Sequence, residues 1–331
     1  MAHKITLNSA KLKNDSGKTY EFKFDSNLIE EFIRNLDFSL TESQYDAVEE
    51  IKKSFSLNHP TSRLIQGDVG SGKTIVVLIA SLIACLSKLQ AAILVPTEIL
   101  ADQHMKTFNE ILKDTNFKIK TLKNNMPDSE KNNIVSELSK GKIDIVIGTH
   151  SLLSKQIEFY KLGLVIVDEQ HKFGIRQRSA LSEQVESSNK IQPHQIFISA
   201  TPIPRSLSLV LYEGLDYTLI KDLPQGRKTI ITRLIHNDNK KTLYASVRNI
   251  LNEGSQAYWV CPSINQTESS EFEHIYDVYE KLQIELKEYS IGMLHGQADK
   301  IDNKKAMKNF IMGKCQILVC TTMIEVGVDG E

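Results

Sequence analysis

The chain has 331 residues with 40 basic and 41 acidic side chains, so its formal net charge is −1. This length is typical of about two domains, and 41% hydrophobic with 24% charged residues is typical of a soluble globular protein. The balanced charge excludes a basic tail or an overall positive field as the way to bind nucleic acid, so such a site must be a local patch.

The sequence indicates neither export nor membrane insertion. The N-terminus lacks the apolar run of a signal peptide. The longest apolar stretch, Ile75 to Leu86, is too short for a bilayer that needs about 20 residues, and it fits a buried helix. The cysteines have no CxxC spacing, which favours reduced thiols: Cys85, Cys261, Cys315 and Cys320. We therefore expect a cytoplasmic protein with no membrane partner.

Short apolar runs alternate with helical patterns along the first two thirds of the chain, which predicts an α/β fold with a parallel sheet covered on both faces. The predicted strands lie at 63–66, 91–96, 144–149, 162–169 and 195–200. The charged stretch KDLPQGRKT, from Lys221 to Thr229, has no periodicity and is typical of a linker.

After this linker the alternation starts again. Apolar runs at 230–235, 256–261, 290–295 and 316–320 flank predicted helices near 239–252, 272–287 and 299–313. In the second of these helices one apolar face is formed by Ile275, Tyr279, Leu282 and Leu286. We therefore expect an appendage over 1–30, a first α/β unit over 31–223, and an incomplete second α/β unit over 224–331.

The segment GDVGSGKT, Gly67 to Thr74, matches the phosphate-binding pattern GxxxxGK[ST] between a predicted strand and a predicted helix. Its glycines let backbone N–H groups turn toward phosphate oxygens, and the helix N-terminus adds partial positive charge. Lys73 would then reach the β- and γ-phosphates of ATP, and the Thr74 hydroxyl would bind Mg²⁺. The alternative is a flexible glycine turn with a chance Lys–Thr pair. The remaining candidate nucleotide contacts in the loop are Gly70, Ser71 and Gly72.

Two acids, Asp168 and Glu169, end the apolar run LGLVIV. In a phosphate-loop protein an acid at a strand end holds Mg²⁺, so Asp168 is the second metal candidate and Glu169 would polarise the attacking water. His171, close behind, has two other interpretations, a solvated turn residue or a packing residue.

Further polar residues follow other predicted strands, where open α/β sheets bind ligands. The hydroxyls of Ser199 and Thr201 could link the nucleotide to a second ligand, or could mark a plain strand-to-turn transition. Four residues suit contacts to a phosphate backbone: Thr97, Gln103, Thr149 and His150. For the two threonines, capping of a helix is the alternative.

The chain resembles the RecG family of bacterial ATP-dependent DNA helicases in superfamily 2. The resemblance is carried by six segments in this order: PTEILADQH, IGTHSLL, VIVDEQHKFGIRQR, SATPIPRSL, DLPQGRKT and TTMIEVGVD. The resemblance covers roughly residues 30 to 329. It implies two RecA-like P-loop domains in series, with ATP and Mg²⁺ as cofactors. It also implies branched DNA as the partner in recombination and stalled-fork repair, a monomer, and a place on the bacterial nucleoid.

The resemblance also assigns roles to single residues. In a Q motif, Gln44 would read adenine with Phe38 packed nearby, although Gln44 is also explained as a polar residue at a helix start. The residues that would couple the state of ATP to the binding of DNA are Gln170, His171, Ser199 and Thr201. The residues that would contact the DNA backbone are Thr97, Gln103, Thr149, His150, Thr321 and Thr322. Two more, Gly327 and Asp329, would approach the nucleotide. Trp259 could stack on a base, but we favour a place in the core.

The chain departs from the family pattern in three respects. The family's N-terminal wedge domain is not recognisable before the Q motif, the sequence ends before the family's QxxGRxGR motif, and Gly330–Glu331 does not continue as the family does. We therefore expect an incomplete helicase core with weak activity by itself and doubtful fork recognition. The alternatives are a double-strand DNA translocase resembling the related Mfd family, or an ATP-binding remnant without DNA-dependent turnover.

Overall fold

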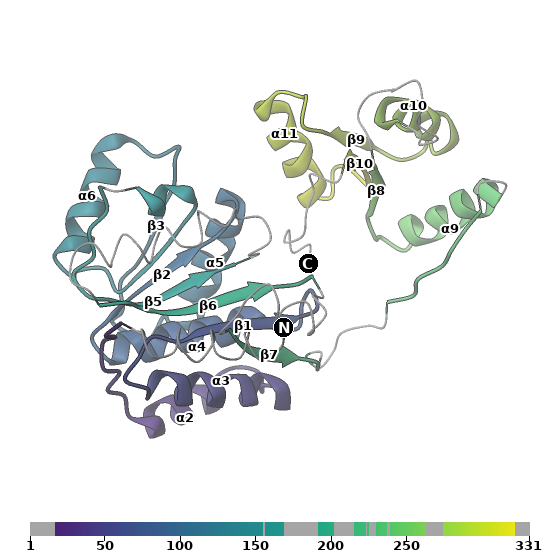
Figure 1. The fold of residues 1–331 in the computed structure, drawn as a ribbon. Helices are drawn as coiled ribbons and strands as arrows, with labels where there is room; N and C mark the ends of the chain where they lie inside the picture. Colours follow the sequence, from purple (N-terminus) through teal and green to yellow (C-terminus); the bar gives the residue numbers. More distant parts are fainter. Residues whose placement is uncertain are drawn as a thin grey trace, which may run out of the picture. The chain divides into compact units, whose positions relative to one another are not determined.

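The structure is a computed structural model that describes residues 17–154, 156–168, 191–201, 215–222, 224, 230–236, 239–262 and 274–321. The chain divides into two compact units, Met1–Arg227 and Lys228–Glu331. Both are α/β units built on parallel sheets, as the sequence predicts (Figure 1). The exact domain limits expected from the sequence stay a prediction.

The first unit is built on a seven-stranded sheet in which every pair of neighbours is parallel. The strand order is β3-β4-β2-β5-β6-β1-β7. The strands are β1 (Ser62–Gly67), β2 (Gln90–Leu94), β3 (Ile119–Leu122), β4 (Ile145–Gly148), β5 (Leu162–Val167), β6 (His194–Ser199) and β7 (Asp216–Ile220). The five predicted runs become the five inner strands. The two strands that the sequence pattern missed, β3 and β7, are the edges.

Helices cover both faces of this sheet because alternate strand residues enter two separate apolar clusters. Ile65, Ile93 and Ile166 belong to one cluster, and their neighbours Leu64, Leu94 and Val165 belong to the other. The helices are α2 (Ser26–Arg34), α3 (Glu42–Phe55), α4 (Lys73–Leu86), α5 (Glu98–Ile111) and α6 (Asp128–Ser139), with a 3-10 turn η1 (His150–Leu153). Helix α4 is buried from Ile75 to Cys85, which confirms the buried helix expected from its apolar run.

Part of the segment expected to be an appendage packs as an integral part of the first unit. Phe22 and Ile29 are buried in the same apolar cluster as α4. The Phe22 ring lies 4.4 Å from that of Phe55 and 5.1 Å from the imidazole of His194. Two aromatic contacts and a buried isoleucine fix residues 17–34 to the sheet, although their charged composition gave no sign of it.

The second unit contains a three-stranded parallel sheet with the order β8-β10-β9. Its elements are α9 (Lys240–Asn252), β8 (Ala257–Cys261), α10 (Ile275–Glu285), β9 (Ile291–Leu294), α11 (Lys300–Ile311) and β10 (Ile317–Thr321). The predicted apolar face of α10 is confirmed, since Ile275, Leu282 and Leu286 are buried and Tyr279 packs beside them. Trp259 packs against the same cluster and stacks on Tyr244, which supports its assignment to the core.

The run IITRLI at 230–235 is not the β element that the sequence pattern suggested. Residues 230–236 form no helix or strand, and Ile230 and Leu234 are 71% and 92% exposed. An apolar run becomes a strand only when a neighbouring strand pairs with it, and none of the strands described in the structure does so. Among the helices that the structure describes, none is long and apolar enough to cross a membrane.

Candidate functional site

The carboxyl ends of the parallel strands gather the predicted site residues along one edge of the first sheet. The strands β4, β2, β5, β6 and β1 are consecutive neighbours, and a predicted site residue or segment lies at or just beyond the end of each. From β1 the chain crosses over β6 and β5 to reach β2, so the sheet reverses its winding beside the phosphate loop. Open α/β sheets bind ligands at such a reversal.

The phosphate loop has the backbone geometry that its glycines permit. Gly70 and Gly72 have φ values of 71° and 78°, in the left-handed region that other residues rarely adopt. A Cβ on Gly72 would lie 2.1 Å from Nε2 of Gln44, so any other residue there would strain the backbone and displace the Gln44 amide. Gly72 is also the N-cap of α4, which begins at Lys73. The N-terminus of α4 therefore opens at the loop, where a helix favours an anion.

Polar groups of the loop are arranged around the position that a phosphate would take. The Lys73 ammonium donates to the carbonyl oxygens of Gly67 at 2.8 Å and Asp68 at 2.7 Å. The Ser71 hydroxyl is buried and has no hydrogen-bond partner among the residues that the structure describes. Because a buried hydroxyl without a partner is costly, a phosphate oxygen fits this loop well.

Gln44 connects α3 to the phosphate loop. Its amide Nε2 donates to the carbonyl of Ser71 at 2.8 Å, and its Oε1 accepts from the backbone of Thr41 at 2.9 Å. The second bond is half of a capping box at the start of α3, which confirms the helix-start interpretation of Gln44. One N–H and one lone pair of the amide remain for another ligand. Phe38, its predicted companion, is exposed.

Asp168 follows β5 and is buried beside a histidine that the sequence-based hypothesis did not single out. Oδ2 of Asp168 lies 2.9 Å from Nε2 of His104 on α5, and both side chains are largely buried. No group of three or more potential metal ligands occurs in the part of the chain that the structure covers. Proteins commonly hold Mg²⁺ with one or two carboxylates, water and substrate phosphates, so the Asp168 carboxylate is a donor of the kind that Mg²⁺ takes. Thr74, the other predicted ligand, is half-buried in the first turn of α4.

Ser199 and Thr201 form a small hydroxyl pair at the end of β6, between the strands that lead to the phosphate loop and to Asp168. Their hydroxyl oxygens are 2.9 Å apart, and the Ser199 hydroxyl also accepts from the Thr201 backbone N–H at 3.2 Å. The pair therefore sits between the two halves of the predicted ATP site.

The predicted DNA contacts differ in how well other roles explain them. Thr97 caps α5, since its hydroxyl accepts from the backbone of Leu100 at 3.3 Å, so capping alone accounts for it. Thr149 makes no side-chain cap, and its hydroxyl is buried without a partner among the described residues. Thr321 in the second unit has the same property. Gln103 is half-buried and His150 is exposed. Thr149 and Thr321 are thus the candidates that most need a ligand.

Several predicted residues lie outside the described part of the chain, so their roles stay predictions. Three of them directly follow Asp168, namely Glu169, Gln170 and His171. The other three, Thr322, Gly327 and Asp329, lie near the end of the sequence.

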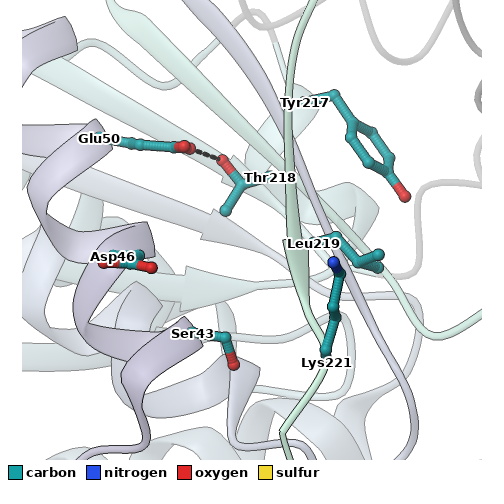
Figure 2. A pocket seen from close by; sticks show the side chains of 7 residues that line it. All are labelled: Ser43, Asp46, Glu50, Tyr217, Thr218, Leu219 and Lys221. Atoms are coloured by element: carbon teal, nitrogen blue, oxygen red, sulfur yellow. Dashed lines mark hydrogen bonds between the residues drawn. The ribbon is translucent and has the colours of Figure 1, made fainter.

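A pocket of about 410 Å³ lies between α3 and β7, and its lining includes none of the predicted site residues (Figure 2). Figure 2 shows Thr218 pointing toward α3 and hydrogen-bonded to Glu50, whereas Tyr217 and Leu219 point to the other side of β7. Near this pocket Arg63 donates to Glu50 at 2.7 Å and to Thr218 at 2.8 Å. Since Ser43, at its rim, also donates its backbone N–H to Asp222 at 2.9 Å, these contacts fix α3 against β7.

Comparison with known proteins agrees with this arrangement. Residues 41–210 match the family model of DEAD/DEAH box helicases, which is more than half of the chain. The chain belongs to this helicase family. Residues 241–331 match the family model of the helicase conserved C-terminal domain, so each unit of the chain matches a helicase model.

Within the family the chain is similar to RecG proteins. It is 38% identical to the ATP-dependent DNA helicase RecG of Aquifex aeolicus over 98% of this chain and 40% of the relative. It is 40% identical to RecG of Thermotoga maritima over 93% of this chain and 39% of the relative. A solved structure of RecG bound to a three-way DNA junction superimposes with a TM-score of 0.79 at 36% identity, covering 98% of this chain and 42% of that one. The chain thus spans about two fifths of the length of these relatives.

Proposed function

We propose that this chain is the motor part of an ATP-dependent DNA helicase of RecG type, which acts on branched DNA in recombination and in the repair of stalled replication forks. The observation that carries the proposal is the row of phosphate loop, hydroxyl pair and Asp168 on neighbouring strand ends of one sheet. The similarity to RecG proteins supports DNA rather than RNA as the nucleic acid along which the chain moves. We expect it to act as a monomer on the nucleoid.

The residues of the first unit divide the work of ATP hydrolysis. The loop from Gly67 to Thr74 would bind the phosphates, with Lys73 exchanging its two carbonyl partners for phosphate oxygens. Thr74 and Asp168 would hold Mg²⁺. Bound ATP would supply the phosphoanhydride bond that is hydrolysed, and the Mg²⁺ would neutralise charge on its phosphates. Glu169 would orient the attacking water. Gln44 keeps one donor and one acceptor, which is the pair that an adenine edge requires.

Movement along DNA requires that both units hold the DNA backbone and sense the nucleotide. We assign one strand of backbone contacts to Thr97, Gln103, Thr149 and His150, and further phosphate contacts to Thr321 and Thr322. The residues that would couple these contacts to the ATP site are Ser199, Thr201, Gln170 and His171. Two residues of the second unit, Gly327 and Asp329, would approach the nucleotide. The buried, unpartnered hydroxyls of Thr149 and Thr321 support backbone binding, because a phosphate oxygen would satisfy each.

The experiment is an ATPase and binding assay of the 331-residue chain with linear, single-stranded and forked DNA. Since the chain spans about two fifths of the length of its relatives, we expect ATP binding with slow turnover. Lys73→Ala should remove both nucleotide binding and residual turnover. DNA binding should weaken steeply as salt rises, because contacts to phosphates release counterions.

The assay separates the parts of this proposal. Binding of ATP that survives in Lys73→Ala would contradict the assigned site. Affinity for DNA that stays constant from low to high salt would contradict backbone contacts.

A further inference from the structure

His104 joins α5 to the carboxylate that we assign to Mg²⁺. Its Nε2 lies 2.9 Å from Oδ2 of Asp168, and the two residues are 64 positions apart in the sequence. Because an ionised carboxylate only accepts hydrogen bonds, the imidazole contributes the N–H. The contact therefore fixes one of the two oxygens with which Asp168 could bind a cation.

The position of His104 in α5 is otherwise apolar. Ala101 and Phe108 are the other buried residues of this helix, and with His104 they form a single stripe toward the core. The Phe108 ring lies edge-on to the imidazole, with centroids 6.2 Å apart and planes at 86°. Nδ1 of His104 is buried and has no hydrogen-bond partner among the residues described. A polar ring is costly in such a place, and a leucine would meet the packing requirement without that cost.

We propose that His104 is a positioning residue that holds Asp168 in the orientation needed to bind the Mg²⁺ of ATP·Mg²⁺. Carboxylates that bind metals are commonly oriented by a hydrogen bond of this kind, and loss of the orienting partner typically costs about 10- to 100-fold in metal affinity. This inference rests on the proposed function, because it requires Asp168 to be a metal ligand.

The same helix gives this hydrogen bond a place in the coupling of DNA to ATP. Helix α5 has Thr97 as its N-cap and carries Gln103, two of the residues assigned to the DNA backbone. If DNA bound at Thr97 and Gln103 displaces α5, the hydrogen bond of His104 would pass that displacement to Asp168. The route is a single helix and a single hydrogen bond.

The test measures binding of a fluorescent ATP analogue to the 331-residue chain at increasing Mg²⁺ concentration. We compare the wild type with His104→Leu, which keeps apolar bulk but loses the N–H, and His104→Gln, whose amide donates from a similar position. We expect His104→Leu to raise the Mg²⁺ concentration at half-saturation about 10-fold and to leave Mg²⁺-independent nucleotide affinity unchanged. His104→Gln should restore most of the loss. Adding duplex DNA should shift the midpoint in the wild type but not in His104→Leu.

Two controls make the outcomes decisive. Met105→Leu alters the packing of the same helix at nearly constant volume and should behave as the wild type does. Asp168→Asn tests the proposed function separately, since an unchanged Mg²⁺ midpoint in that variant would overturn Asp168 as a ligand. If Asp168→Asn shifts the midpoint and His104→Leu does not, only the role of His104 is overturned. Equal loss of affinity with and without Mg²⁺ in His104→Leu would also overturn it, because it would show general damage.

Discussion

The two units of the chain achieve a packed core to different extents. In the first unit both sheet faces are covered, and the strands β2, β4 and β5 are buried along their whole length. In the second unit β8 alternates between half-buried and exposed residues, with Tyr258 43% and Val260 55% exposed. The first unit thus has the core of an independent domain, whereas within the described residues one face of β8 has little cover. Stability should therefore be concentrated in the first unit.

The largest expected effect on the free energy of unfolding comes from replacing one buried leucine by alanine in each unit. Leu78 in α4 and Leu282 in α10 are both fully buried in their respective cores. Each Leu→Ala change should cost about 2–5 kcal/mol through lost burial and a residual cavity. The single tryptophan, Trp259, lies in the second unit, so its fluorescence in urea reports that unit while circular dichroism reports both.

If the units are independent, Leu78→Ala shifts the circular dichroism transition and leaves the fluorescence transition in place. Leu282→Ala should shift the fluorescence transition, together with the part of the circular dichroism signal that comes from the second unit. A fluorescence transition that moves equally in both variants would show that the two units unfold together, and the comparison between them would fail.

The next effect concerns the edge of the first sheet. The Arg63 guanidinium is largely buried and binds Glu50, Thr218 and Ser54. Arg63→Met keeps the apolar stem but removes these bonds, which should cost about 2 kcal/mol after allowing for the exposure of Glu50. Denaturation followed by circular dichroism measures the loss. As the matched control, Lys23→Ala removes an exposed ion pair with Glu21 and should cost less than about 0.5 kcal/mol.

The sequence predicted the parts of the structure in which local pattern and local chemistry coincide. Strands such as β4 and β5 are buried on both faces, so they appear as continuous apolar runs. The phosphate loop is recognisable because its chemistry is contained in eight consecutive residues, Gly67 to Thr74. These are the features that need no knowledge of distant contacts.

What the sequence did not predict depends on contacts between distant residues. The edge strands β3 and β7 are only partly buried, so their pattern is weak. The run at 230–235 has the composition of a strand but no pairing partner in the described structure. His104 stands in helical phase with Ala101 and Phe108, which marks it as buried, but no local signal pairs it with Asp168.

A smaller effect, dependent on pH, should also appear in the first unit. His194 is fully buried and its Nδ1 accepts the backbone N–H of Thr61, while burial lowers the pKa of its imidazole to about 4. The folded pKa is below the unfolded value of about 6.5, so protonation favours the unfolded chain. Stability at pH 7 is unaffected, and it should fall by about 1.4 kcal/mol for each pH unit between about 6.5 and 4.

Urea titrations at pH 7 and pH 5.5 measure this pH-dependent loss, and they should show it in the circular dichroism transition but not in the Trp259 fluorescence. His194→Asn offers an amide oxygen to Thr61 without a titrating ring, so its stability should vary less with pH. A variant that loses as much stability as the wild type between the two pH values would assign the effect to other groups.

The smallest effect tests the exposed face of the second sheet. Val260→Thr keeps the β-branched shape that suits a strand while it replaces an exposed methyl by a hydroxyl. If the face of β8 is open, the free energy of unfolding should change by less than about 0.5 kcal/mol. Self-association measured by light scattering should decrease, because exposed apolar side chains promote association. If instead the substitution costs about 1.5 kcal/mol or more, as a buried hydroxyl without a partner would, β8 is covered in solution and both units have complete cores.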